Sequence, residues 1–458
     1  MKIPTMFETI RRPTLGVAIR CAAFVAATLL LAAPALVMAQ VEPEVFATGL
    51  VAPQGIVVDD QGRIWVAEQG TGNSDGRISV VLPNGQVHPF LTDMPSNIVQ
   101  GQPESAHHLL FHDGMLWATL GLGEESPDGR LLGIDTTDFA PGDPPLSLDD
   151  VEVDEDVASF VLDQDFDDDT DQTNIYNMTI GPDGDLIIVD ASANAVLRRT
   201  SDTGTLSVVA SLPRVTNPTP VGPPMTQAVP TAVIYMDDLL FVTSLPGFPF
   251  VENTGLIYQV DLEGEVSVFH EGFTTAVDLV LDPDGNFVVA QFGGFDPASG
   301  FIPNTGSIVR LTEGNTEQLT TDLNFPAGID FASNGDLYIA AFGDGQLLRV
   351  EGSAIGTATE PNESIPATFM LLHNYPNPFN PYTTIEYELT RPSHVELTVH
   401  NVLGQGIQTL VDEVKLPGAY SARWDGTDGA NRALPSGVYN YRMRAGDQVE
   451  SRTMHLIK

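Results

Sequence analysis

The sequence predicts an all-β protein with two domains, a six-bladed β-propeller followed by a small immunoglobulin-like β-sandwich. Three observations lead to this prediction. A hairpin pattern recurs six times, a segment near the N-terminus can complete the last repeat, and seven or so short strands follow near the C-terminus. With 458 residues, 42% of them hydrophobic, the chain can bury more than one core.

Each repeat contains a short apolar strand, a polar turn rich in Asp, Asn and Gly, and a second apolar strand. This pattern is typical of a β-hairpin. Successive repeats start 46 to 69 residues apart, which is the range of four-stranded propeller blades with variable loops. The repeats start at Gly55, His108, Asn177, Ala232, Asp278 and Gly328.

The last repeat lacks a strand that the N-terminus can supply. The hairpin at 328–341 is followed by a third strand and then by a small, polar, Pro-containing segment. Residues 44–50 resemble the fourth strands of the other repeats. We therefore expect this segment to pair with the last blade, which closes the ring and leaves no free sheet edge there.

Residues 1–39 are predicted to be a signal peptide. Arg11 and Arg12 precede the apolar run 22–33, and Val37–Ala39 forms a small-x-small motif for signal peptidase. The run is too short for a membrane span, so we expect export by the Sec machinery and no transmembrane span in the mature chain. The Arg pair also permits a twin-arginine signal, although the rest of that motif is absent.

The mature chain has no cysteine, because Cys21 lies within the predicted signal peptide. Its place before the apolar run also disfavours a lipoprotein anchor. A mature chain without cysteine excludes disulfides, thiolate metal sites and a cysteine nucleophile.

Charge is distributed unevenly along the chain. The whole sequence has 61 acidic and 20 basic Lys and Arg residues, a net charge of −41 at pH 7, which argues against nucleic-acid partners and anionic membranes. Residues 40–369 contain 51 acidic and 8 basic residues, whereas residues 370–458 are almost neutral. This pattern favours adaptation of the propeller to salty surroundings, where ions screen its self-repulsion.

The propeller repeats resemble NHL repeats, and residues 40–351 resemble the ScyD/ScyE family of secreted propellers. The most specific stretches are Gly247-Phe-Pro-Phe250 and Phe273-Thr-Thr-Ala-Val-Asp278. The chain has Asn174-Ile-Tyr-Asn177 where the family usually has Asn-Pro-Tyr-Gly. The resemblance implies a secreted propeller and implies no reaction, because the family has no agreed one.

The C-terminal region follows a predicted linker at 352–369. Residues 370–458 resemble the type A C-terminal sorting domain of type IX secretion cargo. This resemblance implies export through the outer membrane by the type IX machinery, to the outer-membrane surface or the extracellular space. The alternative is an ordinary adhesive immunoglobulin-like module. The residues that carry the motif are Asn374, Tyr375, Pro376, Asn377, Pro378, Phe379, Asn380, Gly437, Tyr439 and Lys458.

Candidate ligand-binding residues lie where the innermost strands begin, over the central channel. Gluconolactonase-type propellers hold a divalent ion there, so by analogy Asn177 and Asp278, with Glu104 or His108, are candidate ligands for an ion such as Ca²⁺. The alternative is that these side chains fill or hydrate the channel. Two adjacent histidines without a third ligand are a poor zinc signal. The aligned ring comprises Gln54, His107, His108, Tyr176, Asn177, Thr231, Asp278 and Ala327.

The acidic stretch 149–171 is a second candidate for Ca²⁺. An EF-hand loop starting at Asp163 requires Gly at position 168 and Glu at position 174, where this chain has Asp168 and Asn174. We therefore expect a solvated acidic loop between blades two and three.

Two classes of function remain. The first is a secreted binding or scaffold protein for a small molecule, glycan, peptide or protein. The second is a metal-dependent, lactonase-like hydrolase with its site over the channel. A Walker loop, an HExxH motif and a dinucleotide fingerprint are absent from the sequence. The G-x-S-x-G match at 72–76 joins two predicted strands and has no helix behind it. The sequence therefore favours a binding protein.

Overall fold

The computed structural model describes most of the chain after the predicted signal peptide. Residues 1–39, residues 353–368 of the predicted linker, most of the acidic run 165–171, and Lys458 lie outside the described part. Within that part, no helix has the length and apolar character needed to cross a membrane. The described residues are 41–99, 101–112, 114–121, 129–164, 166, 172–312, 315–352, 369–372, 374–401, 405–430, 432–446 and 448–457.

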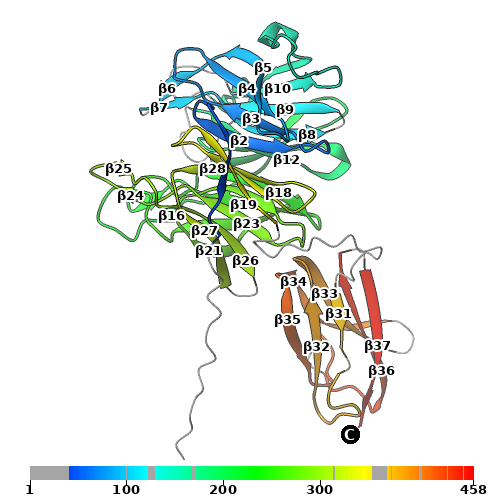
Figure 1. Cartoon of the computed structure of the whole chain (residues 1–458). Helices are drawn as coiled ribbons and strands as arrows, with labels where there is room; N and C mark the ends of the chain where they lie inside the picture. The colour runs from blue at the N-terminus through cyan, green and yellow to red at the C-terminus, as the bar shows by residue number, and fades with distance from the viewer. Residues whose placement is uncertain are drawn as a thin grey trace, which may run out of the picture. The chain divides into compact units, whose positions relative to one another are not determined.

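Six four-stranded antiparallel sheets form the first domain, so the predicted six-bladed propeller is confirmed (Figure 1). Each blade runs from an inner to an outer strand. Blades one to three are β2 (Pro53–Val58), β3 (Ile64–Glu68), β4 (Gly76–Val81) and β5 (Val87–Met94); β8 (Ala106–His112), β9 (Met115–Leu120), β10 (Arg130–Asp135) and β11 (Val153–Asp156); and β12 (Ile175–Ile180), β13 (Leu186–Asp190), β14 (Ala195–Arg199) and β15 (Leu206–Ser211).

The second half of the ring has the same organisation. Blades four to six are β18 (Pro230–Met236), β19 (Leu239–Ser244), β20 (Gly255–Asp261) and β21 (Val266–Phe273); β22 (Ala276–Leu281), β23 (Phe287–Gln291), β26 (Gly306–Thr312) and β27 (Asn315–Leu323); and β28 (Pro326–Phe331), β29 (Leu337–Ala341), β30 (Gln346–Val350) and β1 (Glu44–Thr48).

The first strand of the chain completes the last blade, as expected. β1 pairs antiparallel with β30, with Glu44 opposite Arg349 and Thr48 opposite Gln346. The Arg349 Nε donates to a Glu44 carboxylate oxygen at 2.6 Å, and the Phe46 ring packs edge-on against Tyr338. In Figure 1 the blue β1 accordingly lies within the yellow C-terminal end of the propeller. The inner strands then contact each other in a closed ring, β2–β8–β12–β18–β22–β28–β2.

Aspartates stabilise the hairpin turns of the blades. One oxygen of Asp282 accepts the backbone N–H groups of Asp284 and Asn286 at 3.0 and 2.8 Å. Asp59 and Asp261 do the same in their own turns: each accepts the N–H groups of the residues two and four positions after it. Short polar side chains that bind the local backbone favour turns, which explains why the repeated Asp residues mark hairpins in the sequence.

The hydrophobic core is divided among the interfaces between blades. Trp65 is fully buried and packs against Phe90 of its own blade and Phe111 of blade two. Comparable clusters join blades two and three, and blades six and one. Each blade therefore depends on its neighbours for burial of its apolar side chains.

The structure corrects the prediction for the acidic stretch between blades two and three. Residues Val153–Asp156 form β11, the outer strand of blade two, rather than a loop. The exposed Asp154 and Asp156 alternate with the half-buried Val153 and Glu155. A strand at the rim of a propeller has one face in solvent, so an acidic sequence can form it. The helix α1 (Ala158–Leu162) follows.

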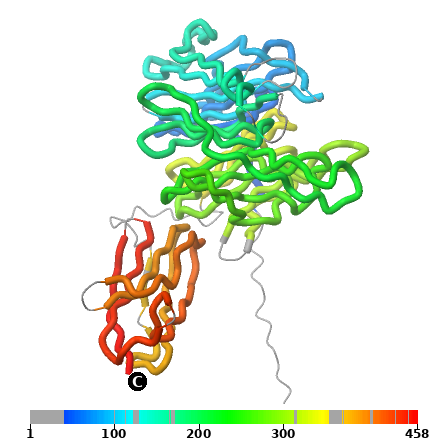
Figure 2. The backbone as a smooth tube through the Cα atoms, turned by 180° about the vertical axis from the view of Figure 1, so that it is seen from behind, coloured from blue at the N-terminus to red at the C-terminus, as the bar shows by residue number. Residues whose placement is uncertain are grey.

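The second domain is the predicted sandwich of seven strands in two sheets. One sheet contains β31 (Phe369–Leu371), β32 (Thr383–Leu389) and β35 (Gly418–Trp424). The other contains β34 (Gly406–Lys415), β33 (Ser393–Asn401), β36 (Gly437–Ala445) and β37 (Gln448–Leu456). These strands form a unit of their own, orange to red in Figure 2.

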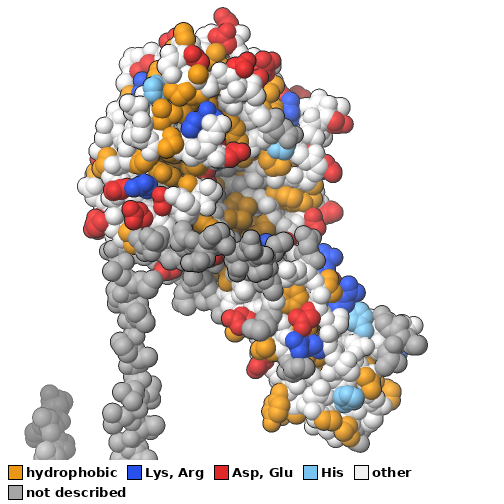
Figure 3. Space-filling model, turned by 45° about the vertical axis from the view of Figure 1, so that its right-hand side comes forward, with side chains coloured by type: hydrophobic (Ala, Val, Ile, Leu, Met, Phe, Trp, Pro, Cys, Tyr) orange, Lys and Arg blue, Asp and Glu red, His pale blue; other side chains and the backbone are white. Residues whose placement is uncertain are grey.

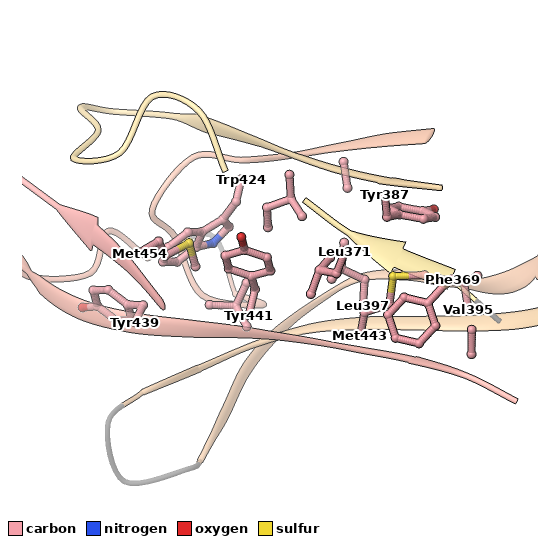
Figure 4. Packing of buried hydrophobic residues seen from close by; sticks show 14 of the residues in the cluster. Phe369, Leu371, Tyr387, Val395, Leu397, Trp424, Tyr439, Tyr441, Met443 and Met454 are labelled. Carbon is pink, nitrogen blue, oxygen red and sulfur yellow. The ribbon is translucent and has the colours of Figure 1, made fainter. Parts of the chain in front are cut away.

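Aromatic side chains fill the space between the two sheets (Figure 4). The Trp424 Nε1 donates to the Thr427 carbonyl at 2.9 Å, and the Tyr441 hydroxyl donates to the Leu372 carbonyl at 2.8 Å. These two buried rings thus have partners for their polar atoms. Phe369 belongs to β31 and to this core, so the sandwich begins one residue before the predicted boundary.

Glycines allow the inner strands to approach closely around the channel. A β-carbon on Gly55 would lie 2.2 Å from the His107 carbonyl oxygen, and one on Gly328 would lie 2.3 Å from the Gln54 carbonyl oxygen. Both glycines occupy the same position in their repeats. The ring can therefore close only if these two positions have no side chain.

We predict that Gly55→Ala destabilises the propeller by about 1–3 kcal/mol, because the added methyl group must push β2 away from β8. The measurement is the free energy of unfolding in urea. Gly247→Ala is the matched control, because its β-carbon would meet only ordinary contacts at 3.6 Å or more. Equal stability of the two variants would contradict close packing of the inner strands.

Candidate functional site

Short hairpins extend from one end of the propeller, which we call the loop face: the end at which the inner strands begin. Because neighbouring strands are antiparallel, connections that enter an inner strand and connections that leave a second strand lie at this same end. The hairpins are β6 (Asn97–Val99) with β7 (Gln102–Glu104), β16 (Val215–Thr216) with β17 (Met225–Thr226), and β24 (Phe295–Asp296) with β25 (Gly300–Phe301). In Figure 1 their labels lie along one side of the propeller.

Three of the predicted ring residues form one contact group near the start of the inner strands. The Gln54 Nε2 donates to the Tyr176 hydroxyl at 2.6 Å. The His107 ring stacks on the Tyr176 ring, with centroids 4.7 Å apart, and its Nδ1 lies 3.2 Å from the Gln69 Nε2. These contacts join blades one, two and three across the channel.

A second group joins blades two, three and five. The Asn177 Nδ2 lies 3.1 Å from the His108 Nδ1 and 3.3 Å from one oxygen of Asp278. The same oxygen accepts the Leu279 N–H at 2.9 Å, and the other accepts the Ile329 N–H of blade six at 2.8 Å. The fold thus brings together His108, Asn177 and Asp278, which are 69 and 101 positions apart in consecutive contacts.

Asp330 is a channel residue that the sequence analysis missed. It lies on β28, and its carboxylate accepts the Val58 N–H of blade one at 2.7 Å and the Phe331 N–H at 2.8 Å. Its position follows Gly328 by two residues, where the equivalent residues of blades one and five are Val57 and Val280. A charged residue among apolar equivalents was the signal that could have identified it.

Burial shifts the protonation equilibria of the channel. It raises the pKa of Asp278 to about 7 and that of Asp330 to about 6. It lowers the pKa of His107 and of His108 to about 4, and it raises the pKa of the Tyr176 hydroxyl. Desolvation therefore shifts every one of these groups toward its neutral form.

The remaining predicted ring residues have other contacts. The Thr231 hydroxyl donates to the Ala276 carbonyl at 2.8 Å and so links blade four to blade five. Ala327 is buried in β28. Glu104 is half-buried on β7, near enough to contribute to the raised pKa of Tyr176.

The predicted metal ligands do not form a ready set of oxygen donors. The Asn177 amide donates to Asp278, and both Asp278 oxygens accept backbone N–H groups. In the described part of the chain, no group of three His, Cys, Asp or Glu side chains is arranged to hold a metal ion. As they are arranged here, the three residues therefore do not fit a bound divalent ion.

A polar pocket of about 410 Å³ lies at the loop face between blades four and five, away from the predicted ring. We call it the blade 4/5 pocket. Gln291, Ser307 and Thr274 belong to its inner part, and Glu252 and Ile302 lie in the loops around it. The sequence gives no sign of this pocket, because its residues come from several separate connections and strands and form no local motif.

The predicted sorting residues divide into buried and exposed groups. Asn374, Phe379 and Tyr439 are buried; the Asn374 N–H donates to the Tyr441 hydroxyl at 3.0 Å, and the Phe379 ring packs against Trp424. These three stabilise the sandwich. The exposed group comprises Tyr375, Pro376, Asn377, Pro378, Asn380 and Gly437, with Tyr375 82% exposed.

We predict that Asp278→Asn and His108→Gln change the pH dependence of stability in opposite directions. Folding raises the Asp278 pKa from 3.8 to about 7, so the protonated side chain stabilises the fold, and this contribution is lost as the pH rises through about 7. Folding lowers the His108 pKa from 6.5 to about 4, so the neutral ring stabilises the fold, and this contribution is lost as the pH falls from 6.5 toward 4.

Relative to wild type, Asp278→Asn should therefore become more stable as the pH rises from 4 to 8, by up to about 4 kcal/mol. His108→Gln should gain relative stability as the pH falls from 6.5 to 4. Urea unfolding across this range measures both, with Asp284→Asn in the exposed turn after β22 as control. Parallel pH profiles for the two channel variants would contradict burial as the cause.

Comparisons with known proteins agree with the two folds. Residues 381–448 match the family model of the FlgD Ig-like domain. A search for similar curated proteins returned no match. Solved structures similar to this chain include virginiamycin B lyase from Staphylococcus aureus, at 16% identity over 81% of this chain and 94% of that one, with a TM-score of 0.36.

A putative gluconolactonase is similar at 16% identity over 68% of this chain and 92% of that one, with a TM-score of 0.43. A putative oxidoreductase (glucose dehydrogenase) from Thermus thermophilus is similar at 15% identity over 68% and 99%, also with a TM-score of 0.43. The propeller assignment rests on the six four-stranded sheets of the structure, and the immunoglobulin-like domain on the sandwich and its family match.

Proposed function

We propose that this protein is an exported binding propeller that engages its ligand at the loop face and is delivered through the outer membrane by its C-terminal sandwich. The observation that carries the binding role is the contrast between two polar regions. The channel groups bond mainly to one another and to the backbone, whereas the blade 4/5 pocket is open at the loop face. Loops on a rigid scaffold are the usual place for binding residues.

The delivery role rests on the two ends of the chain. The predicted signal peptide at 1–39 supports passage through the Sec machinery. The ordered series of sorting motifs after residue 370, on an immunoglobulin-like fold, supports recognition by the type IX machinery. The resemblance of residues 40–351 to secreted ScyD/ScyE propellers agrees with an extracellular or outer-membrane location.

The alternative is a lactonase-like hydrolase at the channel. The observation in its favour is the buried Asp278 with a pKa raised to about 7, near His108, because shifted carboxyl groups are frequent in active sites. Against it stands the internal bonding of the same groups. Asp278 accepts backbone N–H groups of two inner strands, β22 and β28, and this gives it a structural role.

We predict that deletion of residues 369–458 traps the protein in the periplasm of a host with type IX secretion. The measurement is cell fractionation with detection of the propeller. A matched control replaces the tail with an unrelated immunoglobulin-like domain, which should also fail to direct export. Normal secretion of either variant would contradict the sorting role and favour an adhesive module.

We further predict that the purified mature protein contains less than one tenth of an equivalent of divalent metal and does not hydrolyse a panel of lactones. Elemental analysis and a lactone assay measure this, with Asn177→Ala combined with Asp278→Ala as the comparison variant. One equivalent of metal or lactonase activity that disappears in the double variant would support the hydrolase instead.

A further inference from the structure

The geometry of the blade 4/5 pocket points to a ligand class: we propose that it binds a neutral saccharide of one or two rings. The proposal rests on the proposed binding function and specifies its ligand. A volume of about 410 Å³ is in the range of small-molecule sites. The polar groups of the pocket, its charge and its apolar contacts together indicate this ligand class.

Hydrogen bonds hold the inner polar groups in position before any ligand arrives. The Gln291 Oε1 accepts the Thr274 N–H at 2.6 Å, and its Nε2 donates to the Ser307 hydroxyl at 2.9 Å. Ser307 is 94% buried, and because its oxygen accepts this bond, its own hydrogen can donate to a ligand. A fixed donor of this kind lowers the entropic cost of binding.

The loops above this floor contribute a carboxylate next to a glycine. A β-carbon on Gly294 would lie only 3.1 Å from a Glu252 carboxylate oxygen, so the glycine leaves room for this side chain beside the pocket. The Thr305 hydroxyl orders the same loop, since it accepts the Gly294 N–H at 2.8 Å and donates to the Ile302 carbonyl at 2.7 Å. Glu252 can therefore accept hydrogen bonds from a ligand's hydroxyl groups.

The charge of the pocket selects against anions. Glu252 is the one charged side chain among its lining residues, and Lys, Arg and His are not among them. Figure 3 shows the same excess of acidic over basic side chains on the propeller surface. An anionic ligand would meet repulsion without a compensating cation, and a purely apolar ligand would leave the hydrogen of the buried Ser307 hydroxyl without an acceptor.

A neutral saccharide satisfies all of these groups together. Its hydroxyls can donate to Glu252 and accept from Ser307, while its C–H groups contact the exposed side chain of Ile302. Charge-assisted bonds from hydroxyls to a carboxylate are about twice as strong as neutral ones. We therefore expect Glu252 to contribute most to affinity and Ser307 to contribute to orientation.

The test is isothermal titration calorimetry of the full mature protein with cellobiose, maltose and lactose. Glucuronic acid and glucosamine serve as anionic and cationic comparators. We expect at least one neutral disaccharide to bind, Glu252→Gln to weaken its binding about tenfold, and Ser307→Ala to weaken it by a smaller factor. Glu263→Gln is the matched control, because it removes the same charge from an exposed residue in the β20–β21 turn, outside the pocket.

Thermal unfolding of each variant checks that the fold is retained, so a loss of binding is assigned to the pocket. Failure of all three neutral disaccharides to bind, or binding that Glu252→Gln and Ser307→Ala leave unchanged, would overturn the proposal. Preference for glucosamine or glucuronic acid would also overturn it, while leaving a binding propeller intact. Failure of the proposed function itself shows separately, in the fractionation and lactone experiments.

Discussion

Pairing of β1 with β30 is the contact on which the rest of the propeller depends. It joins the start of the domain to its end, so blade six has four strands and no open edge beside β30. Ala47 of β1 then packs in the cluster that blades six and one share. Because the remaining clusters also lie between blades, loss of this closure would expose one interface and weaken the support of its neighbours.

Closure of the ring also creates the channel, and it explains the polar groups there. Six inner strands converge, and Gly55 and Gly328 allow three of them, β28, β2 and β8, to approach most closely. Asp278 accepts the Ile329 N–H of blade six, and Asp330 accepts the Val58 N–H of blade one. Desolvation favours the neutral form of both the carboxyl groups and the histidines. The carboxyl groups therefore reduce stability as the pH rises, and the histidines reduce it as the pH falls. These residues connect the blades around the channel.

The two domains differ in charge in a way that fits separate tasks. The propeller region is strongly acidic with only eight arginines, and the C-terminal region is almost neutral. In the sandwich, the motif residues Asn374 and Phe379 support the core, while Tyr375 is exposed. The same short motif therefore stabilises the fold and presents a surface. The blade 4/5 pocket, by contrast, is assembled from several separate loops and strands.

The sequence by itself determined the architecture, because hairpin periodicity, Asp-containing turns and strand alternation are local properties of neighbouring residues. It also predicted closure of the ring, since the last repeat lacks a fourth strand and residues 44–50 resemble the fourth strands of the other repeats. It missed Asp330, and it described Val153–Asp156 as a loop, because an acidic strand at a rim has no apolar pattern. Only the tertiary structure decided which polar groups are already bonded and which face an open pocket. Asp278 and Glu252 are both carboxylates in the sequence, but folding brings strand N–H groups to one and an open pocket to the other.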